Sequence, residues 1–185
     1  MRELTVDLFV TVDGWAKGTS SPAYFGYGGP DLDAWIDEQT CRPQVMLMGS
    51  TTYRTLAEIV ADADDPASRL MTERGKVVFS RSLSEPLTWA NTTLVRDAAE
   101  AWVAAAKTEP GDPLRVIGSL SLGRSLLRAG LVDRYRLLVF PQVLGSTGAE
   151  PPYAGLPDLD LELIGTSVLD GRLVLLDYRP MVTAG

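Results

Sequence analysis

The strongest constraint on the fold is the alternation of short apolar segments with helical ones along the chain. Residues 4–12 are apolar at every second position, the period of a strand with one buried face. Residues 45–48 are short and wholly apolar, as in strands that are buried on both faces of a parallel sheet. A glycine, hydroxyl residues and a helical pattern follow at once. This order of strand and helix predicts an α/β fold with a mostly parallel sheet.

The rest of the chain continues this pattern and ends in a hairpin. Strands 161–168 and 172–178 flank Asp170-Gly171, a two-residue hairpin signal. Residues 17–30 lack periodicity and predict a long loop that can cover a site. We therefore expect one domain over residues 1–185, with helices on both faces of a central sheet and an antiparallel C-terminal hairpin. The other expected strands are 76–79, 92–95, 114–117 and 135–139, and the expected helices are 31–40, 53–61, 98–107 and 120–129.

The 185 residues include no histidine, which excludes Ser-His-Asp and Cys-His catalysis, the zincins and most transition-metal sites. Proton transfer is then left to carboxylates, Tyr, Lys or water. The lone Cys41 cannot form an internal disulfide, and we expect it to be buried or half-buried. The net charge of −7 argues against nucleic acid as a partner. No apolar run approaches the length of a membrane span, and no export signal is visible, so we expect a cytoplasmic protein.

Two segments share one local pattern: a short strand is followed by a glycine and then by hydroxyl residues that begin a helix. A helix start offers free N–H groups and the positive end of the helix dipole, and glycine lets a phosphate approach the backbone. Two such sites on one sheet can hold a pyrophosphate from both sides. The alternative is that the hydroxyl residues are ordinary helix caps. The residues concerned are Gly49, Ser50, Thr51 and Thr52 in the first segment and Gly118, Ser119, Leu120 and Ser121 in the second.

Several motifs, in this order and spacing, resemble the dihydrofolate-reductase-like superfamily. They are residues 12–14, 48–53, 76–83, 117–119, 131–134 and 140–145. The similarity is to the bacterial branch related to the C-terminal reductase domain of the bifunctional riboflavin-biosynthesis deaminase/reductase. It implies a three-layer fold, NADPH as cofactor, and a homodimer that pairs through edge strands such as those of the hairpin 161–178.

The resemblance also implies roles for individual residues. Phe9 and Ala16 would flank the nicotinamide, and the two glycine segments would hold the pyrophosphate. Ser80 and Arg81 would lie by the adenosine ribose, where the planar guanidinium of Arg81 suits the 2′-phosphate that distinguishes NADPH from NADH.

An acidic residue on the first helix grips the pterin ring in the folate-reducing relatives. Counting back sixteen positions from Gly49 without gaps leads to Asp33, the expected catalytic residue, with Asp31 as second candidate. Ordinary acidic residues at a helix start would look the same. Four aromatic residues can either stack on a flat substrate or pack: Trp15, Tyr24, Tyr27 and Trp35.

The chain departs from the family pattern at three places. Ser119 replaces the second glycine of a Gly-Gly pair, and we expect strain there if its φ is positive. Residues 146–153 have a sequence of their own, and the loop 17–30 lacks a Trp-x-x-Pro segment, so folate is not the expected substrate. We expect hydride transfer from NADPH to a small heterocycle of the pterin, aminopyrimidine or ribityl/ribosylaminouracil type. The alternative is a non-catalytic nucleotide-binding or regulatory protein that keeps the fold.

Overall fold

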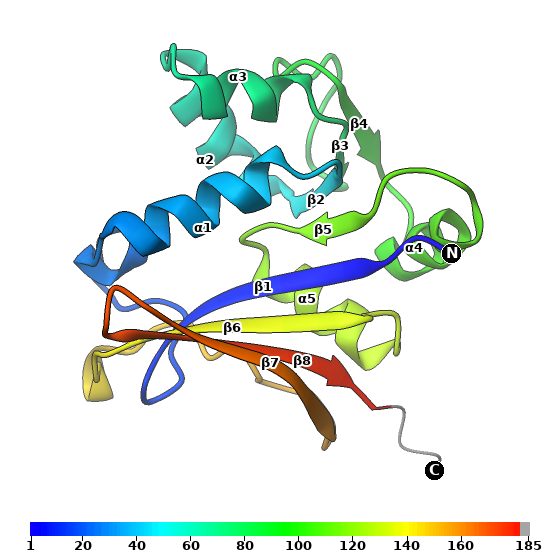
Figure 1. Ribbon diagram of the computed structural model, residues 1–185. Coiled ribbons are helices and arrows are strands. Elements are labelled where there is room, and N and C mark those ends of the chain that lie inside the picture. The colour runs from blue at the N-terminus through cyan, green and yellow to red at the C-terminus, as the bar shows by residue number, and fades with distance from the viewer. Residues whose placement is uncertain (182–185) are drawn as a thin grey trace.

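The computed structural model describes residues 1–181, and within them eight strands form one twisted sheet (Figure 1). Their order is β4-β3-β2-β5-β1-β6-β8-β7. Pairs from β4 to β6 are parallel, whereas β8 is antiparallel to β6 and β7 to β8, which confirms the expected sheet and hairpin. The strands are β1 Leu4–Thr11, β2 Val45–Gly49, β3 Lys76–Phe79, β4 Thr92–Val95, β5 Leu114–Val116, β6 Arg134–Phe140, β7 Leu161–Leu169 and β8 Leu173–Pro180.

Helices cover both faces of the sheet, as expected. The α-helices are α1 Pro30–Cys41, α2 Ser50–Ala61, α3 Pro66–Glu73, α4 Ala99–Thr108 and α5 Leu120–Arg128, with short 3-10 turns η1 Ala23–Gly26 and η2 Gly145–Thr147. Alternate residues of β1 show the two layers. Leu4 and Val6 pack in a cluster with Val103 of α4 and Leu126 of α5. Phe9, from the other face, packs in a cluster with Trp35 of α1.

A buried ionic network ties β1 to β5 and β6 beneath α1. The Asp7 carboxylate accepts bonds from Arg136 Nε at 2.6 Å and from Arg115 Nε at 2.6 Å. The Arg136 side chain and the Asp7 side chain are each only 7% exposed, and that of Arg115 is 15% exposed. Arg136 also donates to the Gln39 side chain of α1 at 2.8 Å. Two buried guanidinium groups thus share one carboxylate and fix α1 on the sheet.

The C-terminal hairpin closes the start of α1 and exposes the edge strand β7. Asp170 and Gly171 have φ values of 51° and 64°, as a two-residue hairpin turn requires. The Asp170 carboxylate accepts the N–H groups of Asp31 and Leu32, while Asp31 accepts the Asp170 N–H. β7 is exposed over most of its length, with Val168 63% exposed.

Helix α3 was not expected from the sequence, and none of its residues is buried. Its first turn is capped by the Asp65 carboxylate. Lys76 of β3 lies at the end of α3, and its ammonium group is also 4.6 Å from the centre of the Trp89 ring. Burial lowers the pKa of Lys76 to about 8. Its hydrogen bonds go to the carbonyl oxygens of Met71, Thr72 and Arg74.

The expectation that Cys41 is buried or half-buried was wrong. The inward face of α1 is formed by Leu32, Trp35 and Gln39, and Cys41 lies beyond this stripe with its side chain exposed. Among residues 1–181, no helix combines the length and apolarity that crossing a membrane would need.

Candidate functional site

The two glycine segments meet at the carboxyl edge of the sheet. β2 and β5 are adjacent and parallel, and the helices that follow them leave to opposite faces, α2 to the face of α1 and α5 to that of α4. A crevice forms where connections diverge in this way. A Cβ added at Gly49 would lie 3.0 Å from Ser119 Oγ, and one at Gly118 would lie 3.2 Å from Thr52 Cγ2. The two turns are therefore packed against each other, and only small residues fit.

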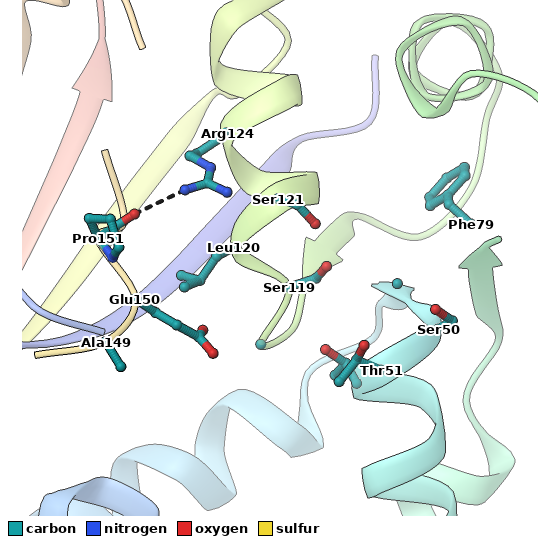
Figure 2. A pocket seen from close by; sticks show the side chains of 13 residues that line it. Ser50, Thr51, Phe79, Ser119, Leu120, Ser121, Arg124, Ala149, Glu150 and Pro151 are labelled. Atoms are coloured by element: carbon teal, nitrogen blue, oxygen red, sulfur yellow. Dashed lines mark hydrogen bonds between the residues drawn. The ribbon is translucent and has the colours of Figure 1, made fainter. Parts of the chain in front are cut away.

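A cleft of about 440 Å³ opens between these turns (Figure 2). All eight residues predicted for the pyrophosphate, 49–52 and 118–121, line it. Phe79 of β3 forms one wall, and its ring is held at 5.7 Å from that of Trp102. Arg124 and residues 149–151 complete the lining. The structure thus joins the two segments that the sequence showed only as repeats of one design.

The first turns of α2 and α5 have no side-chain cap. Gly49 precedes α2 and Ser119 precedes α5, and neither helix shows a capping hydrogen bond from a side chain. The Asp170 carboxylate caps α1 and that of Asp65 caps α3, whereas α4 likewise has no side-chain cap. The hydroxyl residues therefore do not act as caps in this structure, and both helix starts line the cleft. Within residues 1–181, no side-chain hydrogen bond is formed by Ser50, Thr51, Thr52, Ser119 or Ser121.

The strain expected at Ser119 is absent. Gly118 alone adopts the left-handed conformation, with φ +64°, while Ser119 has φ −97°. Serine is therefore compatible with this turn, because a side chain is disfavoured only at the preceding position.

The predicted adenosine-side residues lie beyond Phe79, outside the cleft lining. Ser80 Oγ accepts the N–H groups of Ser82 and Leu83, each at 3.2 Å, and so shapes a tight turn. Arg81 is exposed on this turn. The Arg96 guanidinium donates to the Arg81 carbonyl at 3.4 Å, which brings a second cation to the same place. Sequence reasoning missed Arg96, because nothing in its local pattern distinguishes it.

The predicted nicotinamide and substrate residues also lie outside the cleft lining. Phe9 packs against Tyr24, with ring centres 5.4 Å apart. Asp33 is exposed on α1, and its charge adds to burial in raising the pKa of the Tyr24 phenol. The Ala16 N–H donates to the Glu150 carbonyl at 3.1 Å, which connects Ala16 to the cleft wall. Asp31, the second candidate, is used in the cap between α1 and the hairpin.

Three of the four aromatic candidates have packing roles. Trp15 lies directly against Gly148. The Tyr27 hydroxyl donates to the Pro141 carbonyl, and Trp35 lies beneath the Arg136 guanidinium. Tyr24, 40% exposed, is the most exposed of the four.

Arg124 and Glu150 are the charged side chains of the cleft lining, and the sequence analysis missed both. Arg124 lies one helical turn after Leu120, so the spacing of four residues was an available signal. Glu150 comes from a distant segment, and no local pattern places it here.

A second hollow of about 290 Å³ lies at the opposite, amino edge of the sheet. Arg115, Arg134 and Arg136 line it, but these cations are paired with Asp7 and Asp177. Because each of these cations already has a carboxylate partner within the protein, the carboxyl-edge cleft is the better candidate for a site.

The fold and the crevice define an α/β protein with a cleft at the carboxyl edge of its sheet, and comparison with known proteins gives the family. A model of the RibD C-terminal domain matches residues 2–175, so the chain belongs to this family. The uncharacterized protein YyaP of Bacillus subtilis (strain 168) is 25% identical over 184 residues, covering 96% of this chain and 95% of that protein.

Two solved structures show the same fold. A putative riboflavin biosynthesis protein from Shewanella sp. PV-4 has a TM-score of 0.75 at 19% identity, with 97% of this chain and 99% of that chain covered. The diaminohydroxyphosphoribosylaminopyrimidine deaminase/5-amino-6-(5-phosphoribosylamino)uracil reductase of Thermotoga maritima has a TM-score of 0.69 at 15% identity, with 97% of this chain and 57% of that chain covered. The expected dihydrofolate-reductase-like fold is thus confirmed.

Proposed function

We propose that the protein is an NADPH-dependent reductase of a small heterocycle of the pterin, aminopyrimidine or ribityl/ribosylaminouracil type. The observation that carries this proposal is the pair of uncapped helix starts that face one cleft. Membership of the RibD C-terminal domain family supports it, and so does the reductase named in the Thermotoga maritima protein. NADPH, when bound, would supply the hydride.

The residues of the cleft fit a dinucleotide. Gly49 and Gly118 let the two turns pack closely against each other, and the helix starts of α2 and α5 that line the cleft suit a pyrophosphate. Arg81, with Arg96 beside it, would bind the 2′-phosphate, and Ser80 shapes the turn that presents it. Phe9 and Ala16 would border the nicotinamide.

Asp33 is the proposed proton carrier for the substrate side. It is exposed and lies near Tyr24, whose phenol is protonated at neutral pH; burial and the Asp33 charge raise the pKa of that phenol further. Either group can therefore steer a proton to a substrate nitrogen without histidine. The Asp33→Asn variant should lower the turnover rate with little change in the dissociation constant of NADPH. Asp37→Asn, one turn further on the exposed side of α1, is the matched control.

The binding test adds a charge to the cleft. Ser121 is exposed in the first turn of α5, where a carboxylate favours the helix but repels phosphate. Ser121→Asp should keep or raise the melting temperature and weaken NADPH binding by about tenfold or more, equivalent to ~1.4 kcal/mol. Ala67→Asp, in the first turn of α3 outside the cleft, should leave binding unchanged. Equal effects of both variants would contradict the proposed site.

The catalytic test is oxidation of NADPH in the presence of a panel of pterins, aminouracils and quinoid compounds. Steady oxidation with any of them supports the reductase. Micromolar binding without oxidation by any member would instead favour the alternative, a nucleotide-binding protein that keeps the fold. A dissociation constant above the millimolar range for both NADPH and NADH would overturn the cofactor assignment.

A further inference from the structure

Residues 146–153, where the chain has a sequence of its own, form a fixed ribbon with the segment after β1. The Ala149 N–H donates to the Lys17 carbonyl at 2.9 Å, and the Thr19 N–H donates to the Thr147 carbonyl at 3.0 Å. A β-bridge joins Gly18 and Gly148 between these bonds. The ribbon is therefore a built part of the fold, although its sequence differs from the family pattern.

The ribbon presents one carboxylate to the cleft. The Glu150 backbone is held on one side by the Ala16 N–H at 3.1 Å, and the next carbonyl, of Pro151, accepts a bond from Arg124 at 2.9 Å. Figure 2 shows the Glu150 side chain directed toward the space between Leu120 and Thr51. Its side chain is 51% exposed, and the nearest cation, Lys17, lies 3.9 Å away. Most of the hydrogen-bonding capacity of this carboxylate is thus open to a ligand.

A carboxylate repels phosphate, so its partner in this cleft has to be a hydrogen-bond donor. The two oxygens of one carboxylate can accept from the two neighbouring hydroxyls of a ribose. Glu150 lies between the two glycine turns and Ala16, which are the proposed places of the pyrophosphate and the nicotinamide. In a dinucleotide, the group between those two parts is a ribose.

We propose that Glu150 binds the hydroxyls of the nicotinamide-side ribose and so selects a complete dinucleotide over an adenosine nucleotide. This assignment rests on the proposed function. It adds a binding residue that the motifs of the chain did not indicate, supplied by the segment that differs from the family pattern.

The test compares three ligands: NADP⁺; 2′-phospho-ADP-ribose, which keeps this ribose and lacks the nicotinamide; and 2′,5′-ADP, which lacks the nicotinamide, this ribose and the phosphate attached to it. Isothermal calorimetry measures their dissociation constants for the full chain and for Glu150→Ala, with Glu150→Gln as the isosteric variant. Glu109→Gln, an exposed glutamate at the end of α4, is the control.

We expect Glu150→Ala to weaken NADP⁺ and 2′-phospho-ADP-ribose by about tenfold or more, the effect of losing a charge-assisted hydrogen bond, and 2′,5′-ADP by less than about twofold. Glu150→Gln should lie between the wild type and Glu150→Ala. Equal changes for all three ligands, unchanged binding of NADP⁺, or tighter binding of every ligand would overturn the assignment alone. Failure of the wild type to bind any of the three would overturn the proposed function, and this assignment with it.

Discussion

Removing the charge of Asp7 is expected to destabilise the protein strongly. Its carboxylate, 7% exposed, is the partner of both Arg115 and Arg136, which are themselves 15% and 7% exposed. Asp7→Asn leaves two guanidinium ions in the interior without their counter-charge and turns an amide N–H toward one of them. Breaking a buried ion pair by removal of one partner costs about 3–5 kcal/mol. For a chain of this length, 1 kcal/mol lowers the melting temperature by roughly 2–4 °C, so we expect a loss of about 10 °C.

Urea unfolding at pH 7, followed by circular dichroism, measures the loss in the free energy of unfolding, and thermal unfolding measures the loss in melting temperature. Glu162→Gln is the control, because its ion pair with Arg179 is half exposed and is worth less than about 1 kcal/mol. Combining Asp7→Asn with Arg136→Met should cost at least about 1 kcal/mol less than the sum of the single variants, since one of the two unpaired cations is then gone. A loss under about 1 kcal/mol for Asp7→Asn, or additive single effects, would refute the argument that buried charge sets this cost.

Three further predictions follow from single features. Arg81→Ala should weaken NADPH binding by about tenfold and leave NADH binding nearly unchanged, because an exposed cation in contact with a 2′-phosphate gains about 1.5–2 kcal/mol in water. Added salt should reduce this difference between the two cofactors. Equal losses for NADPH and NADH would contradict the proposed contact between Arg81 and the 2′-phosphate. Lys76, with a folded-state pKa of about 8 against 10.5 in the unfolded chain, binds a proton only when unfolded between these pH values. The stability of the wild type relative to Lys76→Met should therefore rise from pH 8 to pH 10.5, by at most about 3 kcal/mol, and a flat difference would show that burial does not lower this pKa. The exposed edge strand β7 predicts a homodimer, so light scattering at micromolar concentration should give twice the 20.0 kDa chain mass. Val168→Lys, on this strand, should lower the measured mass toward that of the monomer. A monomeric wild type would rule out the homodimer.

Much of the fold could be predicted from the sequence, because its signals are local. The period of two in residues 4–12 is that of β1, and the Asp170-Gly171 pair marks the hairpin turn that the structure contains. Helix α3 also had a local signal, the Asp65-Pro66 pair at its start, which the sequence analysis did not use; Lys76, from the next strand, caps its end. The exposure of Cys41, in contrast, depends on which face of α1 meets the sheet.

The composition of the candidate site divides in the same way. The glycine and hydroxyl residues of segments 49–52 and 118–121 could be found from the sequence alone, because a strand that ends in a helix start is a local pattern that occurs twice. That the two starts share one cleft was decided by the strand order, which sets β5 beside β2. Glu150 reaches the cleft, and Arg96 reaches Arg81, only through chain segments that are separated in sequence, and packing of this kind leaves no periodic trace in the residues themselves.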